Sequence, residues 1–145
     1  CSIFTKFVDK HNLQDNQFGL EVTETAELSD IKVASDSLKL LKAKGIKIAL
    51  DDFGAGYASL KYVRELPIDV VKLDKHFIFN VSDPTTARLI SFVSEVCDDL
   101  NLEMIGEGIE TEEEKNMMID LGCETGQGYL MHRPDFLKSF ISEKT

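Results

Sequence analysis

The chain has 145 residues, of which 43% are apolar, so it can bury the core of one domain. Its 26 Asp and Glu against 16 Lys and Arg give a net charge of −10, and a surface of that sign repels bulk nucleic acid and anionic lipid. The three cysteines lack CxxC spacing, so we expect free thiols in a cytoplasmic domain. No apolar run approaches the roughly 18 residues of a membrane span, so we expect no membrane contact from this segment.

Short apolar runs alternate with amphipathic stretches along the chain, which is the pattern of βα units around a parallel sheet. We expect an opening helix around residues 3–8 and a final helix over 135–142. Between them we expect, in chain order, a strand over 18–23, a helix over 31–44, a strand over 46–53, a short helix near 59–65, a strand over 70–74, a helix over 84–100, a strand over 102–106, a helix from 112 and a strand over 126–130. Five strands, each followed by a helix, suit either an open doubly wound sheet or part of a (βα)8 barrel.

Three of these helices begin at capping signals. Ser29 or Asp30 can cap the first of them, because a short polar side chain accepts hydrogen bonds from the free N–H groups of the first turn. Asp83 is followed by proline, which favours the first helical position. Thr111 and Glu114 have the spacing of a capping box. These signals support the predicted helix starts.

Charged residues share one face and one end of four predicted strands. Side chains alternate between faces along a strand, so bulky residues such as Ile48 and Leu50 would pack against helices. The opposite face then carries, near the C-terminal end of each strand, Glu21, Asp51, Lys72 and Glu107. Each could by itself be an ordinary solvated acid or surface lysine. Together, carboxylates at close range repel one another without a cation, and their oxygens suit hard ions such as Mg²⁺ or Mn²⁺.

The adjacent pair Asp51 and Asp52 is the sharpest local signal. Neighbouring residues on a strand point in opposite directions, so both carboxylates can reach one site only if the strand bends there. Gly54 and Gly56 follow and supply flexibility. The pair could otherwise be loop acids or helix caps. A bridging carboxylate beside a second one is what a two-metal phosphodiesterase needs, with metals about 3.5–4 Å apart.

Five segments form an ordered series along the chain: residues 20–24 (LEVTE), 51–60 (DDFGAGYASL), 71–74 (VKLD), 106–111 (GEGIET) and 127–130 (QGYL). In their order and close to the expected spacing, they resemble the successive motifs of the EAL domain of cyclic di-GMP phosphodiesterases. The resemblance implies an α/β fold, the (βα)8 TIM-type barrel, of which residues 1–145 would form a partial EAL domain with about the last five βα units. It also implies hydrolysis of cyclic di-GMP to linear pGpG with two Mg²⁺ or Mn²⁺ ions.

The matching motifs imply a set of metal ligands. Glu21 and Asp51 would bind metal, with Asp51 bridging to a second ion held partly by Asp52. Glu107 would be a further ligand, and Asp52 would also contact the substrate.

The same motifs imply the catalytic and supporting residues. Glu107 would order the attacking water and act as the general base, and Lys72 would position that water, contact the substrate and offset phosphate charge. Gln127 would complete the shell around the water and metal. Glu24 and Glu110 would support the site from behind, Glu24 by anchoring the loop after Asp52.

The sequence departs from the family pattern in three ways. Ala55 stands where many members have Thr, and Gly106 where many have Ala; both are small replacements. The Glu-Ala-Leu signature is absent, and with it roughly three strands and two expected metal ligands. A barrel cannot close on five strands, so we expect a longer parent and an inactive, self-associating isolated segment.

Two other functions compete with the enzyme. The chain could belong to an inactive receptor that holds cyclic di-GMP without cutting it, or to a protein-interaction module. Degenerate receptors usually lose acidic ligands, whereas Glu21, Asp51, Asp52 and Glu107 are all present, which favours the enzyme. A homodimer, an upstream sensor domain and a membrane tether of the parent are left open.

Overall fold

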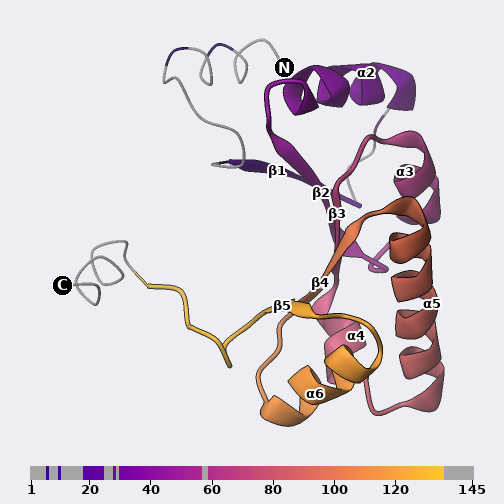
Figure 1. Cartoon of the computed structure of the whole chain (residues 1–145), viewed down its shortest axis with the longest axis vertical. Helices are drawn as coiled ribbons and strands as arrows, with labels where there is room; N and C mark the ends of the chain where they lie inside the picture. Colours follow the sequence, from indigo (N-terminus) through magenta and orange to yellow (C-terminus); the bar gives the residue numbers. More distant parts are fainter. Residues whose placement is uncertain are drawn as a thin grey trace.

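The computed structural model describes residues 18–24, 28, 30–56 and 59–135, together with Lys6 and Lys10, and its strands form one five-stranded parallel sheet (Figure 1). The strands are β1 (Gly19–Thr23), β2 (Lys47–Phe53), β3 (Val70–Leu73), β4 (Glu103–Glu107) and β5 (Thr125–Gln127). The helices are α2 (Ile31–Lys42), α3 (Ser59–Glu65), α4 (Lys75–Phe79), α5 (Pro84–Leu100) and α6 (Glu112–Asp120). The opening and final helices expected from sequence lie, apart from Lys6 and Asp135, outside the described residues.

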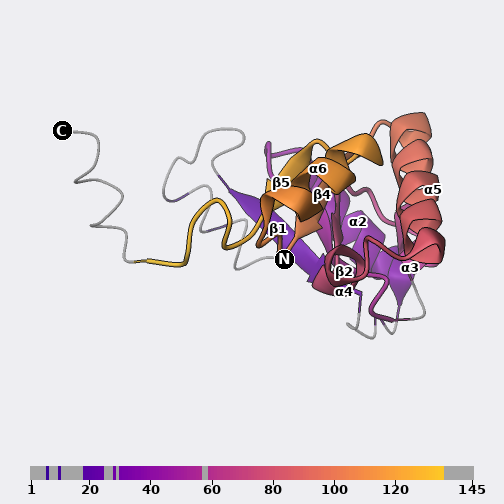
Figure 2. The same ribbon diagram turned by 90° about the horizontal axis from the view of Figure 1, so that it is seen from below.

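The strand order distinguishes between the two architectures that the sequence allowed. The strands follow one another in chain order, β1-β2-β3-β4-β5, and every pair is parallel. A doubly wound sheet reverses its strand order and covers both faces with helices. Here α2, α3 and α5 lie along the same face of the sheet (Figures 1 and 2). This arrangement is that of a barrel wall, with helices outside and the other face turned inward.

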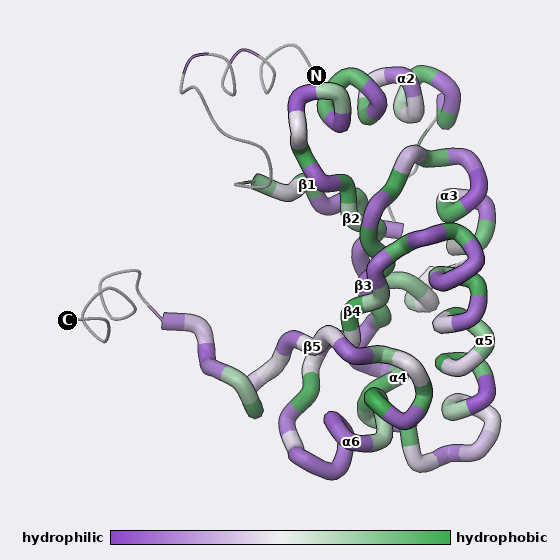
Figure 3. The backbone as a smooth tube through the Cα atoms, viewed as in Figure 1, coloured by the Kyte–Doolittle hydropathy of each residue, from purple (hydrophilic) through white to green (hydrophobic). Residues whose placement is uncertain are grey.

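The core lies between the sheet and these helices. Ile48 and Leu50 on β2 have no exposed surface, whereas Ala49 and Asp51, which alternate with them, are partly exposed. Hydrophobic and hydrophilic residues also alternate along the helices (Figure 3). The bulky face of the strands therefore packs against helices, as strand parity predicted, and the other face is left for charged residues. Among the described residues, no helix is long and apolar enough to cross a membrane.

The predicted helix starts are confirmed. Asp30 caps α2 by accepting from the Lys32 and Val33 amides at 3.0 Å each, so it is the cap among the two candidates considered. Asp83 caps α5, with proline at the start of that helix. Thr111 begins α6 in a complete capping box.

The third strand is shorter than predicted, because a helix follows it at once. The strand ends at Leu73, and Asp74 caps α4 by accepting from the His76 amide at 2.8 Å. Sequence periodicity did not reveal α4, because five residues span barely more than one helical turn. The last strand likewise ends at Gln127 rather than at residue 130, since a turn begins there.

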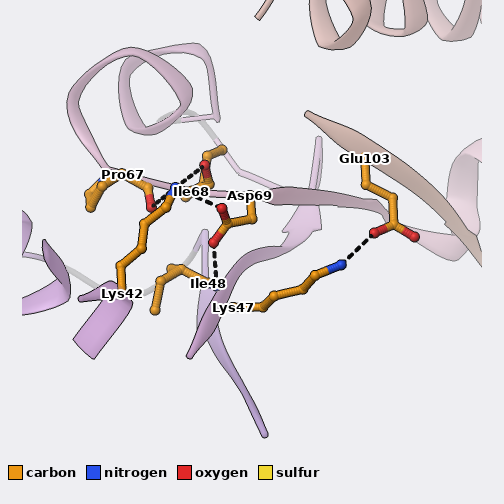
Figure 4. Close-up of polar contacts among 7 residues, drawn as sticks. All are labelled: Lys42, Lys47, Ile48, Pro67, Ile68, Asp69 and Glu103. Atoms are coloured by element: carbon orange, nitrogen blue, oxygen red, sulfur yellow. Dashed lines mark hydrogen bonds and ion pairs between the residues drawn. The ribbon is translucent and has the colours of Figure 1, made fainter. Parts of the chain in front are cut away.

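Polar contacts fix the register at the N-terminal ends of the strands (Figure 4). Asp69 donates its amide to the Ile48 carbonyl at 2.8 Å and accepts from the Ile48 amide at 2.9 Å. Lys42 pairs with the Asp69 carboxylate at 2.6 Å, and Lys47 reaches Glu103 across the sheet at 3.2 Å. These contacts hold β2, β3 and β4 in the alignment that decides which side chains meet at their opposite ends.

Candidate functional site

Lys72 lies at the C-terminal end of the sheet among carboxylates from three other strands. Its Nζ is 2.7 Å from Glu21 Oε1 on β1 and 3.1 Å from Asp51 Oδ1 on β2. It is also 2.7 Å from Glu107 Oε1 on β4. Only 8% of the Lys72 side chain is exposed, and its Asp51 and Glu107 partners are mostly buried, whereas the Glu21 side chain is 54% exposed. The four residues that strand parity placed on one face and one end do meet.

The charge of Lys72 is secured by this environment. Burial by itself lowers the pKa of Lys72, but its close contacts with the Glu107, Glu21 and Asp51 carboxylates outweigh burial and leave the pKa above its ordinary value. The ammonium therefore stays protonated at physiological pH. One lysine cannot balance three carboxylates, so the cluster has room for further positive charge.

A β-bulge brings the two adjacent aspartates to the same site. Between Leu50 and Phe53, β2 advances three residues while the paired stretch of β3 advances two. Asp52 lies in this bulge and has the left-handed backbone conformation, with φ 55°. Asp is one of the few residue types that adopt the left-handed conformation readily. The predicted bend is present, but it lies at Asp52 itself rather than in the glycine loop that was expected to supply it.

The bulge creates a compact set of oxygen ligands. Oxygen atoms from Asp51, Asp52 and Glu107 all lie within 4.8 Å of one another. Asp51 Oδ1 is buried and accepts no hydrogen bond from the part of the chain that the structure describes, although the Lys72 ammonium lies near it as an ion-pair partner. Burial and then the Asp51 charge raise the pKa of Asp52. A hard divalent cation fits this donor set, because carboxylate oxygens are its preferred ligands.

Glu24 holds the loop that follows the bulge. Its carboxylate is buried, with 3% of the residue exposed, and accepts from the Gly54 and Gly56 amides at 3.0 Å each. Gly54 has φ 96, and a Cβ there would collide with the Phe77 ring of α4. The loop after Asp52 is therefore fixed between β1 and α4 and requires glycine at this turn.

We predict that Glu24→Ala lowers the free energy of unfolding by about 1–3 kcal/mol, because two amides lose a buried acceptor. Glu24→Gln should cost less, since it keeps one acceptor oxygen. Urea unfolding measures both, with Glu95→Ala on the exposed side of α5 as the matched control. Equal losses for Glu24→Ala and Glu95→Ala would contradict this role.

A cleft of about 380 Å³ opens beside the acidic cluster. Glu107 on β4 and Gln127 on β5, which are register partners, both line it. Glu110 lines it too, from the segment after β4. The remaining lining residues are Asp52, Asp74, Lys75, Phe79, Gly108, Gly128 and Tyr129. The expected site residues thus divide between the Lys72 cluster and this cleft, except for Glu24, which lies behind the bulge loop.

Sequence reasoning missed the contribution of α4 to the cleft. Asp74, Lys75 and Phe79 all belong to this helix or its cap. Asp74 is 8% exposed and shares strand parity with Lys72, which was a signal that could have found it. Lys75 and Phe79 carried no such signal, because the helix itself was not expected.

Comparisons with known proteins point to one family. The family model for the EAL domain matches residues 1–134. The bifunctional diguanylate cyclase/cyclic di-GMP phosphodiesterase MucR of Pseudomonas aeruginosa is 37% identical over 126 residues, which are 86% of this chain and 18% of that protein. The chain thus spans about a fifth of that curated relative.

Solved structures give the same result. The EAL domain of Mycobacterium smegmatis DcpA aligns with a TM-score of 0.89 at 28% identity, over 97% of this chain and 63% of that one. Klebsiella pneumoniae BlrP1, in a complex with manganese and cyclic di-GMP, aligns with a TM-score of 0.80 at 30% identity, over 89% of this chain and 33% of that one.

Proposed function

Because the chain belongs to the EAL domain family, we propose that it forms the catalytic face of a phosphodiesterase that hydrolyses cyclic di-GMP to linear pGpG. Its five strands would be the C-terminal part of a (βα)8 barrel. The observation that carries the proposal is the meeting of Glu21, Asp51 and Glu107 around Lys72, with Asp52 turned toward them by the bulge. The similar proteins MucR and BlrP1 are named for this phosphodiesterase activity or for a complex with this dinucleotide.

Divalent ions, Mg²⁺ or Mn²⁺, would be held by Glu21, Asp51, Asp52 and Glu107. When bound, they would lower the pKa of water and offset the negative charge of the phosphate oxygens. The buried Asp51 Oδ1 without a hydrogen bond from the described residues, together with the raised pKa of Asp52, supports this assignment. BlrP1 has been solved with manganese and with calcium beside the dinucleotide, which supports an oxygen-ligand site of this kind.

The chain's own residues divide the remaining work. Glu107 would accept a proton from the attacking water at a carboxylate oxygen, while the water oxygen bonds to phosphorus and the bond from phosphorus to the ribose 3′-oxygen breaks. The departing 3′-oxygen would take a proton from solvent and become a hydroxyl. The Lys72 ammonium, 2.7 Å from Glu107 Oε1, would orient that carboxylate and donate to a phosphate oxygen as charge develops. Gln127, the register partner of Glu107, would orient the water through its amide. Glu24 would keep the bulge loop in place, and Glu110 would support the wall of the cleft.

We expect the full-length protein to cut cyclic di-GMP in Mn²⁺ or Mg²⁺ and to lose this activity in EDTA. Removing the ions leaves the carboxylate cluster without the charge that binds phosphate oxygens. Turnover to linear pGpG measures the activity, and a titration in Ca²⁺ measures binding separately. Binding in Ca²⁺ with no turnover in Mg²⁺ or Mn²⁺ would identify a receptor instead. Undiminished turnover in EDTA would rule out the metal assignment.

A further inference from the structure

Phe79 is an aromatic side chain displayed at the cleft on a fixed support. It is the last residue of α4, 51% of it is exposed, and it lines the cleft. The preceding residue, Ile78, is fully buried, and the Asn80 side chain closes the helix by donating to the His76 carbonyl at 2.8 Å. Single exposed hydrophobic residues are common and need no explanation. Phe79 does require an explanation, because its helix is anchored on both sides of it and because it lies in a polar cleft beside the candidate catalytic cluster.

Because the cleft is lined mainly by negative charges, an uncharged surface in it can contact a phosphate-bearing ligand without repelling it. Its lining includes the carboxylates of Asp52, Asp74, Glu107 and Glu110, against the single ammonium of Lys75. A ligand that carries two phosphates is repelled by such a wall wherever bound cations do not offset it. Attraction through a neutral base has no such penalty, because the face of a base stacks on an aromatic ring irrespective of net charge.

The spacing of Lys75 and Phe79 suits one nucleotide. Residues four apart lie on the same face of a helix, about 6 Å apart along its axis. Both side chains line the cleft, so a cation and an aromatic ring are presented together, as the phosphate and base of a nucleotide require. Tyr129, 53% exposed on the same cleft, already has the Arg133 guanidinium 4.9 Å from its ring centre. Phe79 is therefore the better stacking surface.

We propose that Phe79 is a substrate-binding residue whose ring stacks on one guanine base of the cyclic dinucleotide, with Lys75 beside the adjoining phosphate. This inference rests on the proposed function and adds a base-recognition role for α4. Stacking of this kind is the same in the ground state and in the transition state. It therefore acts on substrate affinity and leaves the chemical step alone.

The test compares Phe79→Leu and Phe79→Ala with Phe79→Trp in the full-length protein. We expect Leu and Ala to raise the Kd for cyclic di-GMP in Ca²⁺, and KM in Mn²⁺, by about 5- to 150-fold, the range for one stacked base. The value of kcat should change by less than about twofold. Phe79→Trp should keep the affinity for cyclic di-GMP, because its larger aromatic ring can also stack on a base. Phe92→Ala, at an equally exposed phenylalanine (51%) outside the cleft on α5, should change neither constant.

Several results would overturn the inference. Binding by Phe79→Leu as tight as that of the unsubstituted protein would show that the ring face is not used. Equal weakening by Phe92→Ala, or a loss confined to kcat, would also contradict it. Because Leu and Trp keep a bulky apolar side chain, they decide the question even if Phe79→Ala fails to fold. If the unsubstituted protein does not bind cyclic di-GMP at all, the proposed function fails and the inference falls with it; if it binds normally and Phe79→Leu does too, only the inference fails.

Discussion

Glu107→Gln is expected to lower kcat for cyclic di-GMP by about 10²–10⁴-fold, the usual contribution of a general base. The amide has the size of the carboxylate and keeps one oxygen that can face Lys72. In the unsubstituted protein, Lys72 Nζ lies 2.7 Å from Glu107 Oε1. It cannot take up a proton, and it is a poorer ligand for a divalent ion. Affinity for the dinucleotide in Ca²⁺ should fall much less, because we expect the bases and phosphates to contact other parts of the cleft.

Glu113→Gln is the matched control for this substitution. Glu113 is an exposed residue of α6 that lies outside the cleft and outside the contacts of Lys72. Its replacement should leave kcat nearly unchanged, since it removes one carboxylate charge without touching the site. Turnover in Mn²⁺ and titration in Ca²⁺ separate the two effects. If Glu107→Gln cuts as fast as the unsubstituted protein, Glu107 is not the base.

The convergence on Lys72 could be predicted from sequence because it depends on strand alternation alone. Glu21, Asp51, Lys72 and Glu107 each lie at or near the C-terminal end of a strand, on the face opposite its bulky residues, and parallel strands bring such ends together. Alternation does not say how the strands are ordered, so the choice between an open sheet and a barrel wall needed the observed order. The resemblance to the EAL domain already pointed to the barrel.

Two local features could not be read from the sequence. The bulge at Asp52 depends on how β2 pairs with β3, and a register shift leaves no mark in the pattern of a single strand. The helix α4 is too short to show periodicity, although Asp74 is a good cap. As a consequence, Phe79 was not a candidate, and the wall of the cleft that it forms was missing from the predicted site.

The position of Lys72 suggests that it substitutes for metal charge when no ion is bound. Its ammonium contacts Glu21, Asp51 and Glu107, three of the four residues that would hold the divalent ions. Because its pKa is raised, the stabilisation it provides is fully present below the pKa of an unfolded lysine, about 10.4, and is lost only as pH rises further. The carboxylate cluster is thus held together across the physiological range.

Lys72→Met should therefore separate the structural role of this cation from its catalytic one. In the full-length protein without metal, we expect the free energy of unfolding to fall by about 1–3 kcal/mol, because three carboxylates lose a charged partner. Added Mn²⁺ should raise the Tm of Lys72→Met more than that of the unsubstituted protein, since the ion no longer competes with an ammonium for the same oxygens. The value of kcat should nevertheless stay lower by about 10²–10³-fold, the usual effect of removing one donor to developing charge.

Lys61→Met, at an exposed lysine of α3, is the control for loss of charge alone. Equal stabilisation of both proteins by Mn²⁺ would mean that Lys72 and the ion do not share ligands, and the cluster would then be an ion-pair network rather than a metal site.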